Sequence, residues 1–186
     1  MSSILIVPIG SVAGLDLAAL VRPLHEAFHL DVTVRSGAPV DPQFAFDTFR
    51  NQFNSTSLLA AILERFGTHP GKVIGITAHD LFVPVLTYVF GEAQLDGTAA
   101  VVSGHRLLES FYGIAPDPHL ERERLVKETV HELGHTFGLV HCHTMDCVMR
   151  TSTAVEEIDV KGVLFCENCD EQIGEALRTG GGPLRA

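Results

Sequence analysis

The chain has 186 residues, of which 46% are hydrophobic and 19% are charged, so it can bury a core and has the composition of a folded protein. Its formal net charge of -10 argues against a nucleic acid or an anionic membrane as partner, because both attract basic surfaces. We expect one domain over residues 1–186 that acts as a monomer.

The N-terminal stretch MSSILIVPIGSVAGLDLAALVRPL begins like a secretory signal. However, no positive charge precedes its apolar run, and Asp16 interrupts that run. We therefore predict a buried strand over residues 4–7, a helix over residues 16–29 that Pro23 kinks or shortens, and a strand over residues 32–35. This order indicates a right-handed parallel crossover. No apolar run approaches the roughly 20 residues that span a bilayer, so we expect a soluble, cytoplasmic protein.

The middle of the chain alternates strand and helix patterns, which is typical of an α/β protein. Residues 36–54 carry four phenylalanines and predict either an ordered loop packed by its aromatic side chains or a bent strand. A helix capped by Asn54 or Ser55 should run to Phe66. Further strands are predicted over residues 73–78, 88–90 and 98–103. A last helix is predicted over residues 167–177, followed by a disordered tail over residues 178–186.

A longer helix should begin at Asp117 and Pro118 and run to about Gly138. An aspartate can cap free backbone amides, and a proline at the first helical position has its φ preset. One face of this helix is apolar and should contact the core, with Val126, Val130, Leu133, Gly134 and Phe137.

The same helix carries the sequence HELGH. His131 and His135 are four residues apart, so their imidazoles lie on one face and can bind one zinc, with Glu132 beside them. This pentad alone also occurs on solvated helix surfaces. Gly138 changes the interpretation, because a left-handed turn there can return His141 to the same metal. Three imidazoles leave one position free for water, as in a catalytic zinc site.

Four cysteines lie in the last quarter of the chain: Cys142, Cys147, Cys166 and Cys169. In a small secreted protein they would suggest disulfides, with three possible pairings. In a larger, unsecreted chain the cluster favours metal binding. The pair Cys166 and Cys169 could by itself be a redox dithiol, but two further cysteines are present to complete a zinc site.

These motifs together resemble one family. The pattern His-Glu-x-x-His-x-x-Gly-x-x-His resembles that of the metzincin peptidases. The cysteine spacing C-x4-C, 18 residues and C-x2-C, with Met149 two residues after Cys147, is similar to that of the archaemetzincins. The segments ITAHDLFVPVLTYVFGEA (76–93) and GTAAVVSGHRL (97–107) also look like the strands that precede the active-site helix in that family.

The resemblance implies a compact metzincin-like domain: a mixed, twisted β-sheet with a backing helix, an active-site helix and a zinc-clamped C-terminal segment. It implies two zinc ions per chain, a catalytic one on the three histidines and a structural one on the four cysteines. It further implies peptide hydrolysis with Glu132 as general base, a Met-turn at Met149, and an edge strand over residues 98–103 along which the peptide substrate lies.

Two other functions stay open. The chain could be a zinc-binding structural or interaction module without activity, although such a module would not need Glu132. It could also be an oxidoreductase built on Cys166 and Cys169, if their thiols were free of metal. The roles of His79 and His143 are open as well, and a turn and a surface position are the simpler interpretations.

Overall fold

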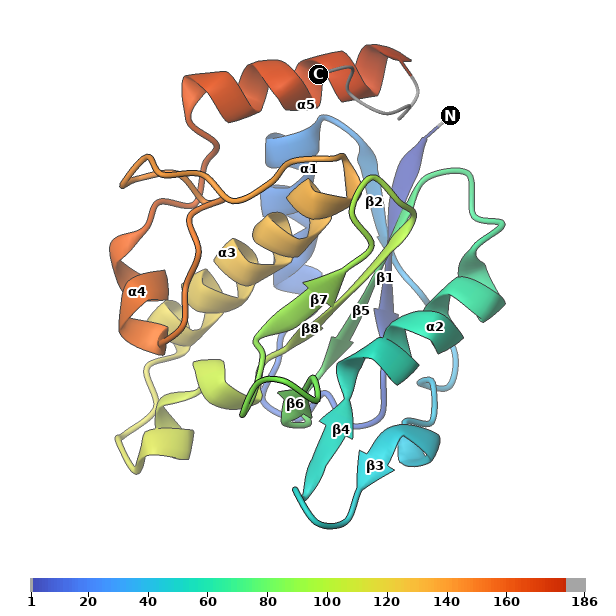
Figure 1. Cartoon of the computed structure of the whole chain (residues 1–186), viewed down its shortest axis with the longest axis vertical. Helices are drawn as coiled ribbons and strands as arrows, with labels where there is room; N and C mark the ends of the chain where they lie inside the picture. The colour runs from blue at the N-terminus through green and yellow to red at the C-terminus, as the bar shows by residue number, and fades with distance from the viewer. Residues whose placement is uncertain (1, 180–186) are drawn as a thin grey trace.

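The computed structural model describes residues 2–179, and Figure 1 shows a central twisted sheet with helices on both faces. The main sheet has five strands in the order β2-β1-β5-β8-β7. All neighbours in it are parallel except β7, which is antiparallel to β8. The strands are β1 (Ser3–Pro8), β2 (Asp31–Val34), β5 (Lys72–Thr77), β7 (Gly91–Ala93) and β8 (Ala99–Ser103).

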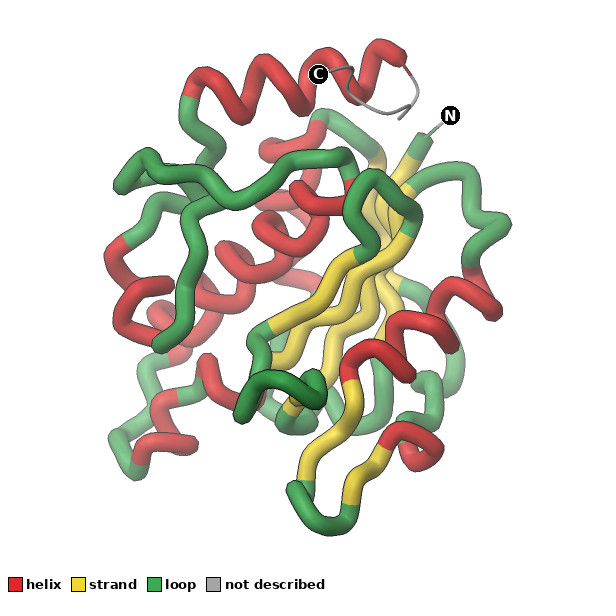
Figure 2. Tube along the Cα trace, viewed as in Figure 1, coloured by secondary structure: helices red, strands yellow, loops and turns green. Residues whose placement is uncertain are grey.

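The helices divide between the two faces of the sheet, as Figures 1 and 2 show. On one side lie α1 (Val21–Phe28), α3 (Pro118–Thr136), α4 (Val155–Val160) and α5 (Glu167–Thr179), and on the other lies α2 (Ser55–Phe66). Short 3₁₀-helical turns cover Ala18–Leu20, Gln43–Ala45, His105–Leu107 and Glu109–Tyr112. None of the helices within residues 2–179 is both long and apolar enough to cross a membrane.

The buried hydrophobic residues form two clusters, and the alternation of side chains along the strands explains why there are two. Successive side chains of a strand point to opposite faces, so alternate residues join different clusters. In β5, Ile74 and Ile76 pack with α1 and α3, whereas Val73 packs with Leu58 and Ile62 of α2. The strands predicted near residues 4–7, 32–35, 73–78 and 98–103 are all present, and β1 and β2 are parallel as expected.

The prediction that residues 98–103 form an edge strand is wrong. β8, which covers most of residues 98–103, lies between β5 and β7, so β7 forms this edge of the sheet and β2 forms the other. A tight turn causes this arrangement: Thr98 N donates to Gln94 Oε1 at 2.8 Å, and Gln94 N donates to Ala99 O at 3.0 Å. The chain therefore reverses beside β8 and adds β7 on its outer side. The strand predicted over residues 88–90 is correspondingly displaced to Gly91–Ala93.

Residues 36–54 contain a short hairpin that the prediction left undecided. β3 (Phe46–Asp47) pairs with β4 (Gln52–Asn54), and β6 (Leu81–Phe82) completes this second, three-stranded sheet. The rings of Phe46 and Phe53 pack with their centroids 5.0 Å apart. Phe44 and Phe49 are exposed, so only half of the predicted aromatic packing exists.

Residues close to the helix ends explain where two of the helices begin. Pro23 lies in the first turn of α1, where its missing N–H has no helical partner, so the helix is shorter than predicted. Asn54 caps α2 by accepting from Ser57 N at 2.8 Å. The final helix extends to Thr179, so the first two residues of the predicted disordered tail are helical, and residues 180–186 lie outside the described residues.

Candidate metal centres

The helix that carries the histidines begins as its sequence predicts. Asp117 Oδ1 accepts from the backbone amides of His119 and Leu120, at 3.0 and 3.1 Å, and Pro118 is the first helical residue. The predicted apolar face of α3 is buried against the sheet, α1 and the segment that follows the helix. This packing fixes the rotation of the helix and turns its histidines towards one cleft.

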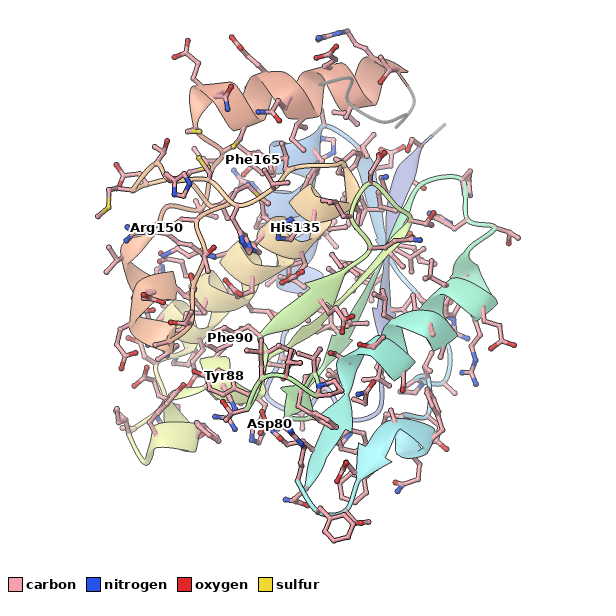
Figure 3. All side chains as sticks on the ribbon, in the orientation of Figure 1. Asp80, Tyr88, Phe90, His135, Arg150 and Phe165 are labelled. Atoms are coloured by element: carbon pink, nitrogen blue, oxygen red, sulfur yellow. The ribbon has the colours of Figure 1, made fainter. Side chains whose placement is uncertain are left out.

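Three imidazoles meet at the C-terminal end of α3. Their ligand atoms all lie within 4.8 Å of one another, and they belong to His131, His135 and His141. The helix ends at Thr136, and Gly138 follows with a φ of 94°, a left-handed conformation that favours glycine. The turn is closed by Gly138 N donating to His135 O at 3.0 Å. This turn returns the chain so that His141 faces the two helical histidines, as predicted. Figure 3 shows His135 on the helix, beside the loop that follows it.

Backbone carbonyls orient two of these rings. His131 Nδ1 lies 2.8 Å from Val148 O, and His135 Nδ1 lies 2.7 Å from Leu139 O. A carbonyl oxygen only accepts, so each Nδ1 carries the hydrogen and each Nε2 presents a lone pair. The two Nε2 atoms are 3.2 Å apart. Two lone pairs at this distance repel each other unless a cation lies between them.

The spacing fits zinc. A tetrahedral zinc with Zn–N bonds of about 2.0–2.1 Å separates two nitrogen ligands by about 3.3–3.4 Å, close to the distance between the two Nε2 atoms. Burial lowers the pKa of all three imidazoles, most strongly that of His131, and so keeps them neutral. Neutral imidazole is the form that binds a metal.

Glu132 lies beside this cluster without belonging to its ligand group. Its side chain is buried, and burial together with the Glu128 carboxylate raises its pKa well above the ordinary value. The edge strand contacts it closely, since a Cβ on Gly91 would lie 2.5 Å from Glu132 Cγ. A glycine at that position therefore leaves room for the carboxylate between α3 and β7.

A cleft of about 320 Å³ opens beside the cluster. Its lining includes His131, Glu132 and His141, a wall from residues 86–91 and a second wall from residues 151–153. Figure 3 shows Tyr88 and Phe90 on the segment that leads into β7. The donor set, the carboxylate and the cleft together can activate a water molecule next to a bound substrate.

Sequence reasoning missed Glu128, which also lines this cleft. It forms a buried ion pair with Lys161, whose Nζ lies 2.8 Å from Glu128 Oε1 and 3.2 Å from Arg150 O. Glu128 lies four residues before Glu132 on the same helix, and this spacing could have identified it. Lys161 follows α4, a helix that was not predicted, and no local pattern marks it.

The four cysteines form a second cluster. Their sulfur atoms lie within 4.8 Å of one another, and all four are free thiols. Cys142 Sγ and Cys166 Sγ are 3.8 Å apart, much longer than a disulfide bond of about 2.05 Å. A tetrahedral zinc with Zn–S bonds of about 2.3 Å separates two sulfur atoms by about 3.8 Å. The spacing thus fits a zinc and not a disulfide.

Backbone amides lie near two of these sulfur atoms, although burial raises the pKa of Cys147 and of Cys169. Thr144 N lies 3.5 Å from Cys142 Sγ, and Cys166 N lies 3.4 Å from Cys147 Sγ. The backbone amide of Cys169 lowers the pKa of Cys166 to about 7. A thiol that loses its proton this readily is prepared to bind a metal.

Met149 connects the two clusters. It is fully buried beneath α3, where a Cβ on Gly134 would lie 2.5 Å from its sulfur. Its carbonyl oxygen accepts from Cys142 N at 2.9 Å. The residue therefore packs under the helix that bears the histidines and also holds the segment that bears the first cysteine.

Neither of the two histidines whose roles were left open, His79 and His143, joins the clusters found among residues 2–179. His79 lies in the turn after β5, where its Nε2 accepts from Ser11 N at 3.4 Å and its ring packs against Phe53. Burial lowers the pKa of His79. His143 is exposed. The turn and surface interpretations of these residues are confirmed.

Comparison with known proteins agrees with this geometry. The family described as Peptidase family M54 matches residues 47–175. An archaemetzincin from Methanopyrus kandleri is 41% identical over 151 residues, which are 81% of this chain and 82% of the relative. Several solved structures are similar to this chain. The crystal structure of the Methanopyrus kandleri archaemetzincin has a TM-score of 0.83 at 34% identity, covering 95% and 96% of the two chains. A zinc-dependent peptidase from Methanocorpusculum labreanum has a TM-score of 0.81 at 29% identity, covering 92% of this chain and all of that one.

The family match spans more than half of the chain, and it includes α3 and both clusters of candidate metal ligands. The fold is that of the similar structures over nearly the whole length. The chain therefore belongs to peptidase family M54, the archaemetzincins, and is a zinc metallopeptidase.

Proposed function

We propose that this chain hydrolyses peptide bonds at a catalytic zinc held by His131, His135 and His141, with Glu132 as the general base. The observation that carries the proposal is the pair of Nε2 atoms 3.2 Å apart, with both rings fixed by backbone carbonyls. Glu132 lies next to this pair but outside the ligand group. Three ligands leave one coordination position towards the cleft, as catalytic zinc sites require.

When bound, zinc lowers the pKa of a water molecule and polarises the carbonyl of the bond to be cleaved. Glu132 takes the proton of the attacking water and passes it to the leaving amine. Its burial removes competing bulk water from the carboxylate, and Gly91 of β7 leaves room for it. The imidazoles stay neutral because burial lowers their pKa, and the Nδ1 hydrogens that His131 and His135 donate to carbonyls leave each Nε2 as the ligand atom.

The substrate backbone should lie along β7. This strand is one of the two edge strands of the main sheet, and its first residue lies against Glu132. An extended peptide can add to such an edge through main-chain hydrogen bonds. The peptide would then pass over the cleft with its scissile bond beside the carboxylate.

We further propose a second, structural zinc on Cys142, Cys147, Cys166 and Cys169. Four sulfur ligands complete a tetrahedron and leave no position for a substrate. This zinc would tie the loop after His141 to the start of α5 and so order the segment that holds Met149. Elemental analysis of protein purified without chelator should give two zinc atoms per chain. One zinc, with Cys166 and Cys169 as a reversible dithiol, would instead support the oxidoreductase interpretation.

The catalytic part is tested with a diverse peptide library, read by mass spectrometry after incubation with zinc-loaded protein. Wild-type protein should cleave peptides, and Glu132→Ala should reduce the rate by about 10²–10⁴-fold, because general acid–base catalysis contributes about that much. The variant should keep both zinc ions, since Glu132 is outside the ligand group. Loss of zinc in Glu132→Ala would contradict its role as base. A wild-type protein that cleaves nothing would support a silent binding module.

A further inference from the structure

Lys72, the first residue of β5, is buried although its side chain is charged. The residue is 9% exposed, and its Nζ lies 4.5 Å from the centroid of the Phe137 ring. Burial lowers the pKa of Lys72, and the nearby Asp96 carboxylate opposes this shift. A buried charge is costly unless polar groups surround it, so its position calls for an explanation. Neither of the two proposed zinc sites uses this side chain.

The partners of Lys72 are carbonyl oxygens of two segments that are distant in sequence. Its Nζ donates to the oxygen of Thr136, the last residue of α3, at 2.7 Å. It also donates to the oxygen of Gly97, in the turn between β7 and β8, at 2.6 Å. Asp96 N donates to His135 O at 2.9 Å and joins the same turn to the same end of the helix. Figure 1 shows this turn beside the C-terminal end of α3.

The end of α3 determines the geometry of the histidine site. Carbonyl groups at the C-terminus of a helix have no partner within the helix and attract cations. Thr136 is fully buried, and its carbonyl would lose this donor if Lys72 were removed. The left-handed turn that follows carries Leu139 O, which holds the ring of His135, and then leads to His141. A shift of the last helical turn therefore moves two of the three imidazoles.

We propose that Lys72 is a positioning residue for the catalytic zinc, because it clamps the end of α3 to the turn between β7 and β8. The clamp sets the geometry of His135 and His141, and it also fixes the distance between these ligands and β7. The inference rests on the proposed function, since it concerns the zinc on the histidines. Removing groups that orient metal ligands typically weakens metal binding by about 10–100-fold.

Metal affinity tests this role without requiring peptide cleavage. Wild-type protein and Lys72→Met, which keeps an unbranched stem but lacks the ammonium group, are equilibrated with buffers of fixed free zinc concentration. Elemental analysis then gives the zinc bound per chain, and His135→Ala identifies the binding step that belongs to the histidines. In Lys72→Met this histidine step should move to an about tenfold higher free zinc concentration. The step that belongs to the cysteines should not move.

A conservative variant should restore the affinity. Lys72→Arg keeps a cation with several N–H donors. A cavity of about 580 Å³, lined by Lys72, Asp96 and Phe137, gives the larger guanidinium group room. The histidine step of Lys72→Arg should therefore lie close to that of the wild type.

Lys127 supplies the matched control. It is 2% exposed, and its Nζ also donates to two carbonyl oxygens, those of Ile158 and Asp159, at 3.0 and 3.2 Å. These contacts join α3 to the end of α4 and not to the turn between β7 and β8. Lys127→Met should lower the melting temperature and leave the histidine step unchanged. If either methionine variant fails to fold, the pair Lys72→Gln and Lys127→Gln, which keeps N–H donors, replaces it in the same comparison.

The outcomes separate this inference from the proposed function. An unchanged histidine step in Lys72→Met, or an equal shift in Lys127→Met, would overturn the positioning role and leave the catalytic zinc in place. A Lys72→Arg protein that binds zinc as weakly as Lys72→Met would also overturn it, because a cation would then not be sufficient. A wild-type protein without any histidine step would overturn the proposed catalytic zinc itself.

Discussion

The histidine cluster and the cysteine cluster each include one of two adjacent residues, His141 and Cys142. The two clusters are nevertheless assembled in different ways. Two of the three histidines come from one rigid helix, and carbonyl oxygens orient their rings. The cysteines come from the loop after α3, the start of α5 and the residue just before it. The helix therefore arranges most of the histidine site in advance, whereas the cysteine site requires two separate segments to meet. We expect metal loss to disturb the fold at the cysteines and the chemistry at the histidines.

The largest effect should follow from removing the cysteine site. Changing Cys166 and Cys169 together to serine should lower zinc content by about one per chain. It should also destabilise the fold strongly, because structural zinc contributes on the order of 10 kcal/mol of binding that is linked to folding. Elemental analysis and thermal unfolding measure both effects. Unchanged zinc content and melting temperature would show that these thiols do not hold a metal.

Removing one histidine should abolish chemistry with less effect on the fold. His135→Ala should lose the catalytic zinc and all measurable peptide cleavage, while the zinc on the cysteines remains. The matched control is His143→Ala, since His143 is exposed and outside the cluster, and it should keep both zinc ions. If His135→Ala unfolds as extensively as the cysteine variant, the contrast between the two sites is wrong.

Acidification should remove the catalytic zinc only at a pH below the one at which an ordinary histidine gains a proton. An ordinary imidazole has a pKa of about 6.5, and burial lowers the pKa of all three ligands below that value. A lowered folded-state pKa means that the unfolded chain binds protons first. The stability from these groups is therefore complete above about pH 6.5 and falls as the pH drops from there towards the lowered values.

Zinc content measured across this pH range would show the loss of the catalytic zinc. The variant His135→Ala serves as the control, because it should hold only the zinc on the cysteines. Catalytic zinc that does not depend on pH down to strongly acid conditions would mean that other groups hold it.

The smallest effect should come from the helix cap. Asp117→Ala removes the acceptor for two backbone amides and should cost about 1 kcal/mol of unfolding free energy. Both zinc ions should remain, because the cap lies at the opposite end of α3 from the histidines. Asp117→Asn keeps an acceptor and should be close to wild type in denaturant unfolding. A loss of zinc in Asp117→Ala would show that the histidine site depends on the whole helix and not on its last turns.

Local patterns were enough to predict much of this protein. The four-residue spacing of His131 and His135 places them on one helix face, and Gly138 supplies the left-handed turn that returns His141. The cap at Asp117 and the apolar runs of β1, β5 and β8 are equally local. These features depend on residues within a few positions of one another, so helical and strand periodicity determine them.

Other features were decided only by the tertiary structure. The edge position belongs to β7 and not to β8, because a reversing turn adds β7 to the outer side of the sheet. The ion pair of Glu128 with Lys161 and the position of Ser152 bring distant segments together at one cleft. Periodicity states which face of an element is apolar, but it does not state which other element covers that face. Such pairings depend on the packing of the whole chain, and the lining of the cleft follows from them.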